Sequence, residues 1–305
     1  MRMVREQSKD WIKSFCEWYN KNQNILFESF IAFYGEDERE TIIEEIDNIP
    51  FLFILSDVAY LNCKNVPEDS FAKKLIAYFR HNNLVLDTLA RKGAGNIRIL
   101  NEAIKASMID KYPRGSFEYF LHRGYIEEPS NGVTHFDSDG TNPIIILPIY
   151  FVNDRIIFHE INHVLTTPKR RKDLFPSVEV DELLNELASR DILRIFKSLG
   201  GKILPYELDL GDEYKDNLFL MRDFYERFKD LIKKCTRNGD IRILKDNLGD
   251  YNLALYFALV KKLYHKKYIT DIDIKRINFL IWQMEEYQKT KRECYNRIRL
   301  RKLEK

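Results

Sequence analysis

Apolar residues recur at steps of three and four along the first third of the chain, which is the spacing of one face of an α-helix. Three such stripes precede residue 80: Trp11, Ile12, Phe15, Trp18 and Tyr19; Ile42, Ile43 and Ile46; and Phe71, Leu75, Ile76 and Phe79. Stripes of this kind usually pack into a core, so we interpret them as buried helix faces. The pattern therefore predicts a helical region over residues 1–130.

A polar, turn-rich stretch over residues 129–142 separates this region from a short apolar segment. Residues 144–152 are mostly β-branched or aromatic and too few for a typical helix, so we predict a strand. Pro148 has no N–H to donate to a sheet, which places the predicted strand at a sheet edge. An extended peptide would be able to pair with such an edge.

Two amphipathic helices are predicted next. Asn153 is a typical N-cap residue, and the helix that it opens is expected over 154–165. A second helix is expected over 178–199, because Gly200 and Gly201 form the glycine signal of a helix C-terminus. Further helices are predicted over 213–236, 250–267 and 271–303.

Together these elements predict an α+β fold that is mainly α. We divide it into an N-terminal helical region (1–130), a core with the small sheet and the two helices (131–205), and a C-terminal helical region (206–305). The composition agrees, since 45% hydrophobic and 13% aromatic residues are typical of a folded chain. The 12 Gly and 9 Pro in 305 residues are few, which also favours helices.

Charge and hydropathy limit the partners. The net charge of +2 gives no overall argument for nucleic-acid binding, so nucleic acid is a disfavoured partner. No apolar run approaches the roughly twenty residues that span a membrane, and the N-terminus lacks the apolar part of a secretory signal. We therefore expect no membrane partner and a cytoplasmic location, with export without a cleaved signal left open. The four cysteines form no CxxC pair and are expected to be reduced thiols.

The segment RIIFHEINHVLTT, residues 155–167, contains the metal-binding motif HExxH. His159 and His163 are about one helical turn apart and about 40° apart around the axis, so both imidazoles project from one face. Two nitrogen ligands for a tetrahedral metal ion are thus expected on one helix. The apolar residues of the helix lie on a different arc and are expected to face the core: Ile157, Ile161, Val164 and Leu165.

Glu160 follows the first histidine and lies beside the metal position rather than on it, about 60° from His163 around the helix. A carboxylate there can take a proton from a metal-bound water. Zinc would lower the pKa of that water to about 7 and polarise the scissile carbonyl. Glu160 is therefore the predicted general base of a zinc-dependent hydrolysis.

A catalytic zinc needs a third protein ligand. Glu182 and Glu186 share one face of the helix expected over 178–199, so helical geometry alone allows either of them. The sequence NELAS around Glu186, taken with HEINH, resembles the gluzincin group of zinc metallopeptidases over about residues 143–199. The resemblance implies a zincin-like core with one zinc ion per chain, held by His159, His163 and Glu186, with Glu160 as the base.

Under this resemblance Glu182 would not bind the ion directly. Helix geometry adds a second reason for choosing Glu186, because Arg190 follows one turn later on the same face and could hold the Glu186 carboxylate deprotonated and oriented. The sequence departs from thermolysin-like members at Arg190, where they have an aspartate, and Asp191 is the nearest replacement. Asp191 falls on the apolar arc of its helix, so its carboxylate is expected to have a partner. Groups that would steady an oxyanion come only after both motifs: Tyr206, Tyr251, Tyr256, Tyr264 and His265.

We therefore expect a zinc-dependent metallopeptidase acting on peptide or protein substrates. One alternative is a non-catalytic helical protein with a structural zinc site. Another is a binding protein that uses its basic C-terminal helix, since residues 287–305 hold eight Lys or Arg against two Glu. The basic loop Lys169–Lys172 is interpreted as a solvated loop in preference to a selector of acidic substrates.

Overall fold

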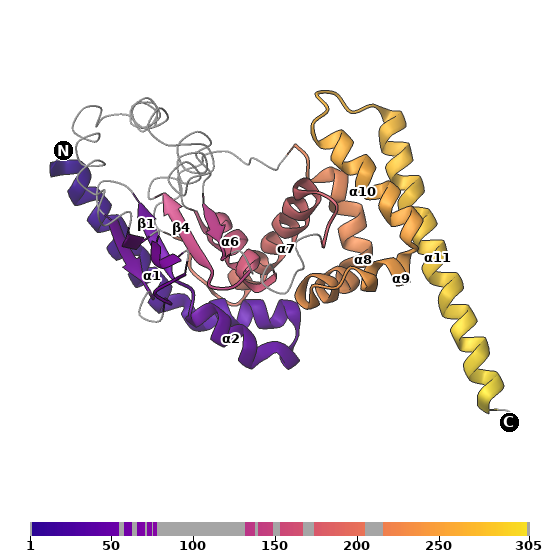
Figure 1. The fold of residues 1–305 in the computed structure, drawn as a ribbon, viewed down its shortest axis with the longest axis horizontal. Helices are drawn as coiled ribbons and strands as arrows, with labels where there is room; N and C mark the ends of the chain where they lie inside the picture. Colours follow the sequence, from indigo (N-terminus) through magenta and orange to yellow (C-terminus); the bar gives the residue numbers. More distant parts are fainter. Residues whose placement is uncertain are drawn as a thin grey trace. The chain divides into compact units, whose positions relative to one another are not determined.

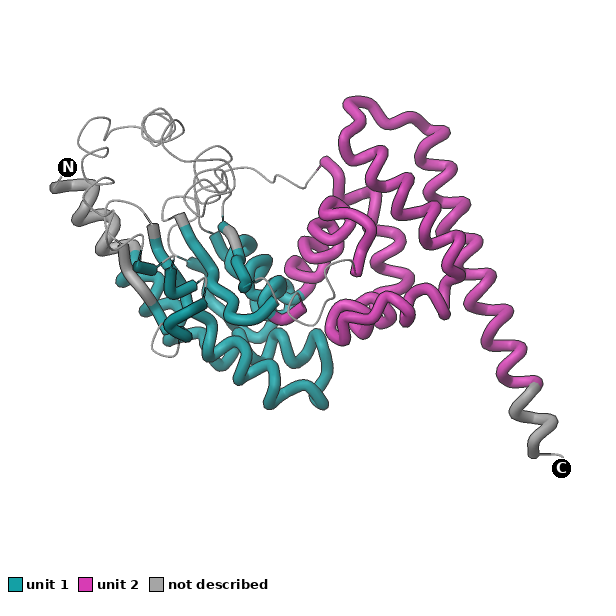
Figure 2. Tube along the Cα trace, in the orientation of Figure 1, with its two compact units in different colours: residues 1–164, 192–210 teal, residues 165–191, 211–305 magenta. Residues whose placement is uncertain are grey.

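The computed structural model has two compact units, coloured separately in Figure 2. Unit 1 comprises residues 1–164 and 192–210, and unit 2 comprises residues 165–191 and 211–305. The division into three regions that we expect from the sequence stays a prediction. The bounds of the two units differ from the bounds of those regions. The structure describes residues 2–54, 58–62, 66–70, 72–74, 76–77, 132–137, 140–148, 153–166, 174–204 and 216–303. Outside these ranges lie the basic loop 169–172 and the residues Cys63, Phe71, Leu75, Phe79 and Tyr206.

Unit 1 begins with the long helix α1 (Arg2–Tyr34), a short 3₁₀ helix η1 (Glu36–Glu38) and helix α2 (Arg39–Asp47), shown in Figure 1. The aromatic stripe of α1 is buried at Phe15, Trp18 and Tyr19, which confirms its predicted role in the core. The chain leaves α1 at Gly35, whose φ of 128° is a conformation that favours glycine.

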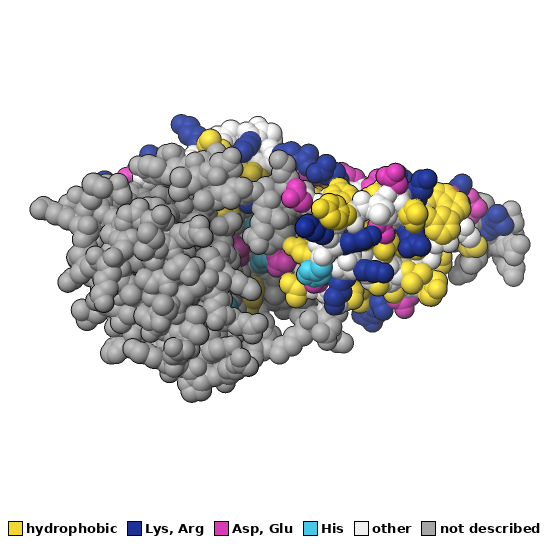
Figure 3. Space-filling model, turned by 90° about the horizontal axis from the view of Figure 1, so that it is seen from above, with side chains coloured by type: hydrophobic (Ala, Val, Ile, Leu, Met, Phe, Trp, Pro, Cys, Tyr) yellow, Lys and Arg dark blue, Asp and Glu magenta, His cyan; other side chains and the backbone are white. Residues whose placement is uncertain are grey.

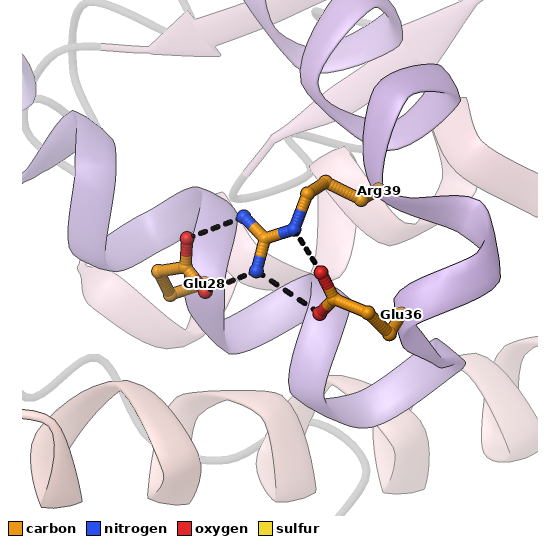
Figure 4. A network of polar contacts seen from close by, with 3 residues as sticks. All are labelled: Glu28, Glu36 and Arg39. Carbon is orange, nitrogen blue, oxygen red and sulfur yellow. Dashed lines mark hydrogen bonds and ion pairs between the residues drawn. The ribbon is translucent and has the colours of Figure 1, made fainter.

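Arg39 forms hydrogen bonds with two carboxylates at this turn (Figure 4). Its Nη1 and Nη2 donate to the two carboxylate oxygens of Glu28 at 2.7 and 3.0 Å, and Nη2 also donates to Glu36 at 3.0 Å. Hydrogen bonding to the guanidinium lowers the pKa of both carboxyl groups. The network is on the surface, where ion pairs add little stability, and it links a side chain of α1 with side chains of η1 and α2.

The sheet has four described strands: β1 (Phe51–Ile54), β2 (Val58–Leu61), β3 (Val133–His135) and β4 (Ile144–Pro148), in the order β2-β1-β4-β3. β1 pairs with β2 antiparallel and with β4 parallel, and β3 pairs with β4 antiparallel. The predicted strand is confirmed over residues 144–148, and residues 149–152 lie outside the described ranges.

The predicted edge position of this strand is wrong. β4 lies between β1 and β3, and Ile145 and Ile146 have partner residues on both sides. Pro148 is the last residue of β4, opposite Ile54, where its missing N–H affects only the end of the ladder. Among the described strands, β2 and β3 occupy the two edges.

Three of the strands were not predicted from the sequence. Residues 51–54 are a continuous apolar run, and a short run of this kind cannot be distinguished from a buried helix segment by its periodicity. Residues 133–135 lie within the stretch that the sequence indicated to be a loop, and they form a strand because they pair with Ile144–Ile146. The front third of the chain is therefore not purely helical.

Two further helices, α6 (Asp154–Thr166) and α7 (Val178–Ser198), confirm the predictions within one residue. The Asn153 side chain accepts a hydrogen bond from the Ile156 backbone N–H at 3.0 Å, as the N-cap prediction requires. At the end of α7, Gly201 N–H bonds to Phe196 at 3.0 Å and Gly200 N–H to Lys197 at 3.1 Å. These two hydrogen bonds, with Gly200 at φ 88°, form a Schellman motif.

The core of unit 1 is aromatic and encloses the sheet. The ring of Phe15 in α1 contacts those of Phe51 and Phe53, which share one face of β1 because side chains alternate along a strand. All side chains from Ile144 to Leu147 in β4 are buried, so both faces of this strand are covered. Phe158 of α6 stacks on Phe30 of α1 at 5.7 Å between ring centroids, which packs α6 onto this core.

Unit 2 contains the remaining described helices: α8 (Phe219–Asn238), α9 (Arg242–Leu248), α10 (Asp250–Tyr264) and α11 (Asp271–Leu303). Three of them confirm predicted helices, and α9 was not predicted because it is only seven residues long. Phe224 of α8 stacks on Tyr256 of α10 at 4.6 Å between centroids, and the Tyr256 hydroxyl donates to Leu220 at 2.8 Å. No described helix is both long enough and apolar enough to cross a membrane.

We expect acid to destabilise the fold through His135 of β3. Burial lowers the pKa of this imidazole from 6.5 to about 4, so the folded chain keeps it neutral while the unfolded chain protonates it below about 6.5. Its contribution to stability is therefore complete above pH 6.5 and lost as the pH falls towards 4. Urea unfolding at pH 7 and pH 5 should show a smaller loss of stability in His135→Gln than in the wild type. Equal losses would contradict this role.

Candidate metal centre

Helix α6 places the HExxH residues as the sequence predicted. Its apolar residues are buried, with Ile157, Ile161 and Leu165 at 0% exposure, so the predicted core-facing arc is confirmed. The polar residues of the motif are also largely enclosed, because His159 and Glu160 are each only 6% exposed. Burying polar groups is costly unless they have partners, so the contacts of each motif residue are informative.

The two imidazoles converge on one point. The Nε2 atoms of His159 and His163 lie 3.1 Å apart, and the ring planes cross at 77°. Two nitrogens bound to a tetrahedral zinc ion at about 2.0–2.1 Å each would lie roughly 3.3 Å apart. The His159–His163 pair therefore has the spacing of two ligands to a shared metal ion.

Glu160 is held by a strand residue, Thr134, that no sequence motif indicated. The Thr134 hydroxyl of β3 lies 2.6 Å from Glu160 Oε2, to which it can donate, and 3.2 Å from the Glu160 backbone carbonyl. Gly132, just before β3, leaves no room for a side chain against α6, since a Cβ built there would lie 2.7 Å from Ile156 and 3.2 Å from Glu160 Oε1. The two consecutive β-branched residues Val133 and Thr134 were a sequence signal that could have indicated this strand.

Asn162, the polar residue between the two histidines, is anchored to α1. The Tyr34 hydroxyl donates to Asn162 Oδ1 at 2.5 Å, and Asn162 is buried. Tyr34 is the last residue of α1 and is 128 positions away along the chain, so no local pattern could have indicated it. The polar face of α6 is thus fixed at Asn162 by α1 and at Glu160 by β3.

On α7, the two candidate third ligands, Glu182 and Glu186, differ in their contacts. Glu186 is buried and accepts a hydrogen bond from Arg190 Nε at 2.7 Å, as expected from the sequence. The metal-ligating atoms of Glu182, His159 and His163 lie within 4.8 Å of one another. Among the described residues, this is the group of His, Cys, Asp and Glu side chains that could hold a metal ion, and Glu186 is not part of it. Direct binding by Glu186 stays a prediction from the resemblance.

Asp191 has a hydrogen-bond donor and an ion-pair partner, as we expect for a carboxylate on the apolar arc of a helix. The Tyr225 hydroxyl donates to its carboxylate at 3.0 Å, and Lys229 forms an ion pair with the same oxygen. Asp191 therefore joins α7 to α8 within unit 2. The candidate oxyanion groups have other roles where they are described, since Tyr256 bonds to the α8 backbone and His265 bonds to Glu179 at 2.7 Å. No residue is assigned to the oxyanion.

The chain was compared with models of protein families, with curated proteins and with solved structures. No family model matches it, no curated protein matches it, and no solved structure matches it. The residues of α6 and their contacts are consequently the observations from which a function can be inferred for this chain.

Proposed function

We propose that the chain is a zinc-dependent metallopeptidase. The observation that carries the proposal is the convergence of the His159 and His163 Nε2 atoms to 3.1 Å on the helix that also bears the buried Glu160. Two imidazoles and a carboxylate are a donor set that zinc accepts in hydrolytic enzymes. The group formed with Glu182 has three members among the described residues, which is the number that leaves one position open for water or substrate.

Each side chain of the candidate metal centre has a separate role in the proposed hydrolysis. His159 and His163 hold the ion, and we assign Glu182 as the third ligand. When bound, the zinc ion lowers the pKa of a coordinated water to about 7 and polarises a carbonyl group. Glu160 accepts the proton of the attacking water at its carboxylate and then donates that proton to the leaving amine. The substrate class that suits this chemistry is a peptide or protein.

The contacts of Glu160 support its role as the base. One carboxylate oxygen is hydrogen-bonded to Thr134, and the other lies near the position of Gly132. A carboxylate held on one side by a short hydrogen bond has fewer orientations, which helps to position it as a base. Thr134 would thus be a positioning residue for the base.

The first test is the metal content. We expect about one zinc ion per chain after purification without added metal, falling sharply in His159→Ala because a ligand is removed. Elemental analysis of the wild type and the variant measures this directly. The matched control is His265→Ala, which removes a histidine that is 65% exposed and paired with Glu179, and which should leave the zinc content unchanged.

Equal zinc content in the wild type and His159→Ala would remove the basis for a metal centre on α6. Zinc at a ratio near one without cleavage of any member of a peptide library would instead favour the structural zinc site. Peptide cleavage that is lost in His159→Ala would support the metallopeptidase.

A further inference from the structure

Helix α11 has apolar residues on two opposite faces. One face packs into unit 2, where Ile277, Ile281 and Met284 are buried. The other face carries Phe279 and Trp282, which are 54% and 53% exposed and lie 5.8 Å apart between ring centroids. Figure 3 shows hydrophobic side chains exposed among Lys and Arg on the face of unit 2 that it views. Aromatic residues are enriched at protein interfaces. A surface helix that buries one face in the core usually has polar residues on its outer face.

The exposed aromatic pair is flanked by two residues of opposite charge, each four positions away along the sequence. Lys275 precedes Phe279 by four residues, and Glu286 follows Trp282 by four residues, and both charged residues are exposed. At about 100° per residue, all four side chains fall within an arc of about 60°, nearly opposite the buried face. We name this set, Lys275, Phe279, Trp282 and Glu286, the outer stripe of α11.

The outer stripe is self-complementary under a two-fold rotation. If two α11 helices lie antiparallel about a point midway between Phe279 and Trp282, each Phe279 faces the Trp282 of the other helix. The same rotation brings each Lys275 opposite the Glu286 of the other helix. Such an interface is isologous, because one patch contacts its own copy, and it gives two aromatic contacts and two ion pairs.

We propose that the outer stripe of α11 binds a second copy of this chain to form an antiparallel homodimer. A parallel arrangement would place Lys275 beside Lys275 and Glu286 beside Glu286, which disfavours it. The stripe covers about three helical turns, so the contact is smaller than a standard interface and the dimer should form reversibly with rising concentration. The proposal does not depend on the metal centre.

Sedimentation equilibrium of the full chain tests the proposal. Between about 1 and 500 µM, the apparent mass should rise from that of one chain towards that of two. Trp282→Ala removes two central aromatic side chains from the symmetric interface and should raise the dissociation constant at least about 30-fold. Lys275→Glu should raise it about tenfold, because two ion pairs become two like-charge pairs. The double variant Lys275→Glu with Glu286→Lys should restore the wild-type value.

Tyr295→Ala is the matched control, since Tyr295 is 68% exposed on α11 but lies about 170° from the centre of the outer stripe. It should leave the dissociation constant unchanged. A single-chain mass at every concentration would overturn the proposal. A dimer that Trp282→Ala does not weaken, or that the double charge exchange does not restore, would also overturn it, because the copies would then meet elsewhere. Circular dichroism of each variant confirms that the helix content is retained.

Discussion

Replacing Glu160 by glutamine is expected to slow peptide hydrolysis by a factor of about 10² to 10⁴, the usual contribution of a general base. The amide has nearly the shape of the carboxylate and can still bond to Thr134, so α6 should keep its position. It cannot accept the proton of the attacking water at neutral pH. Zinc content should remain near one per chain, because Glu160 is beside the histidine pair and is not assigned as a ligand.

The measurement is the hydrolysis rate of the zinc-loaded variant on the best substrate from a peptide library. Glu179→Gln is a matched control, since it makes the same change at a carboxylate bonded to His265. It should leave the rate unchanged. Loss of zinc in Glu160→Gln would mean that this carboxylate is a ligand, and an unchanged rate would mean that another group takes the proton.

The second large effect concerns the third ligand. We expect Glu182→Ala to remove most of the zinc and all measurable hydrolysis, because Glu182 forms the described group with His159 and His163. Glu186→Ala should weaken metal binding by only about 10- to 100-fold, which is typical of residues next to ligands. The ion pair with Arg190 at 2.7 Å already occupies one oxygen of Glu186.

Elemental analysis of the two alanine variants, prepared side by side, decides between them. The resemblance of NELAS to the gluzincin motif predicts the reverse order, with an empty site in Glu186→Ala and a filled site in Glu182→Ala. That result would restore Glu186 as the ligand and overturn the assignment of Glu182. Full zinc in both variants would place the third ligand elsewhere in the chain.

The helices around the candidate site could be predicted from the sequence because their limits are set by neighbouring residues. Asn153 caps α6 through a bond three residues ahead, and Gly200 and Gly201 end α7 within the last turn. The facing of His159 and His163 is likewise a property of helix geometry alone. The Arg190–Glu186 pair, one turn apart on α7, could be predicted for the same reason.

The residues that surround the motif could not be predicted, because they come from distant parts of the chain. Thr134 meets Glu160 from 26 positions away, and Tyr34 meets Asn162 from 128 positions away. The edge assignment of β4 failed for a related reason. A proline restricts strand pairing only where its own N–H would bond, and the position of Pro148 at the end of β4 depends on where the strand stops.

The parallel pairing of β1 with β4 has a consequence for the order in which the chain can fold. Phe51 pairs with Ile145, so about ninety residues must be synthesised after β1 before its central partner exists. A ribosome adding about 5–20 residues per second would leave β1 without β4 for roughly 5–20 seconds. During that time α1 and β2 are the sequence-local partners of β1 among the described residues that can cover its apolar side chains. Such non-local pairing slows folding, and nascent chains of this protein should depend on chaperones until residue 148 has left the ribosome.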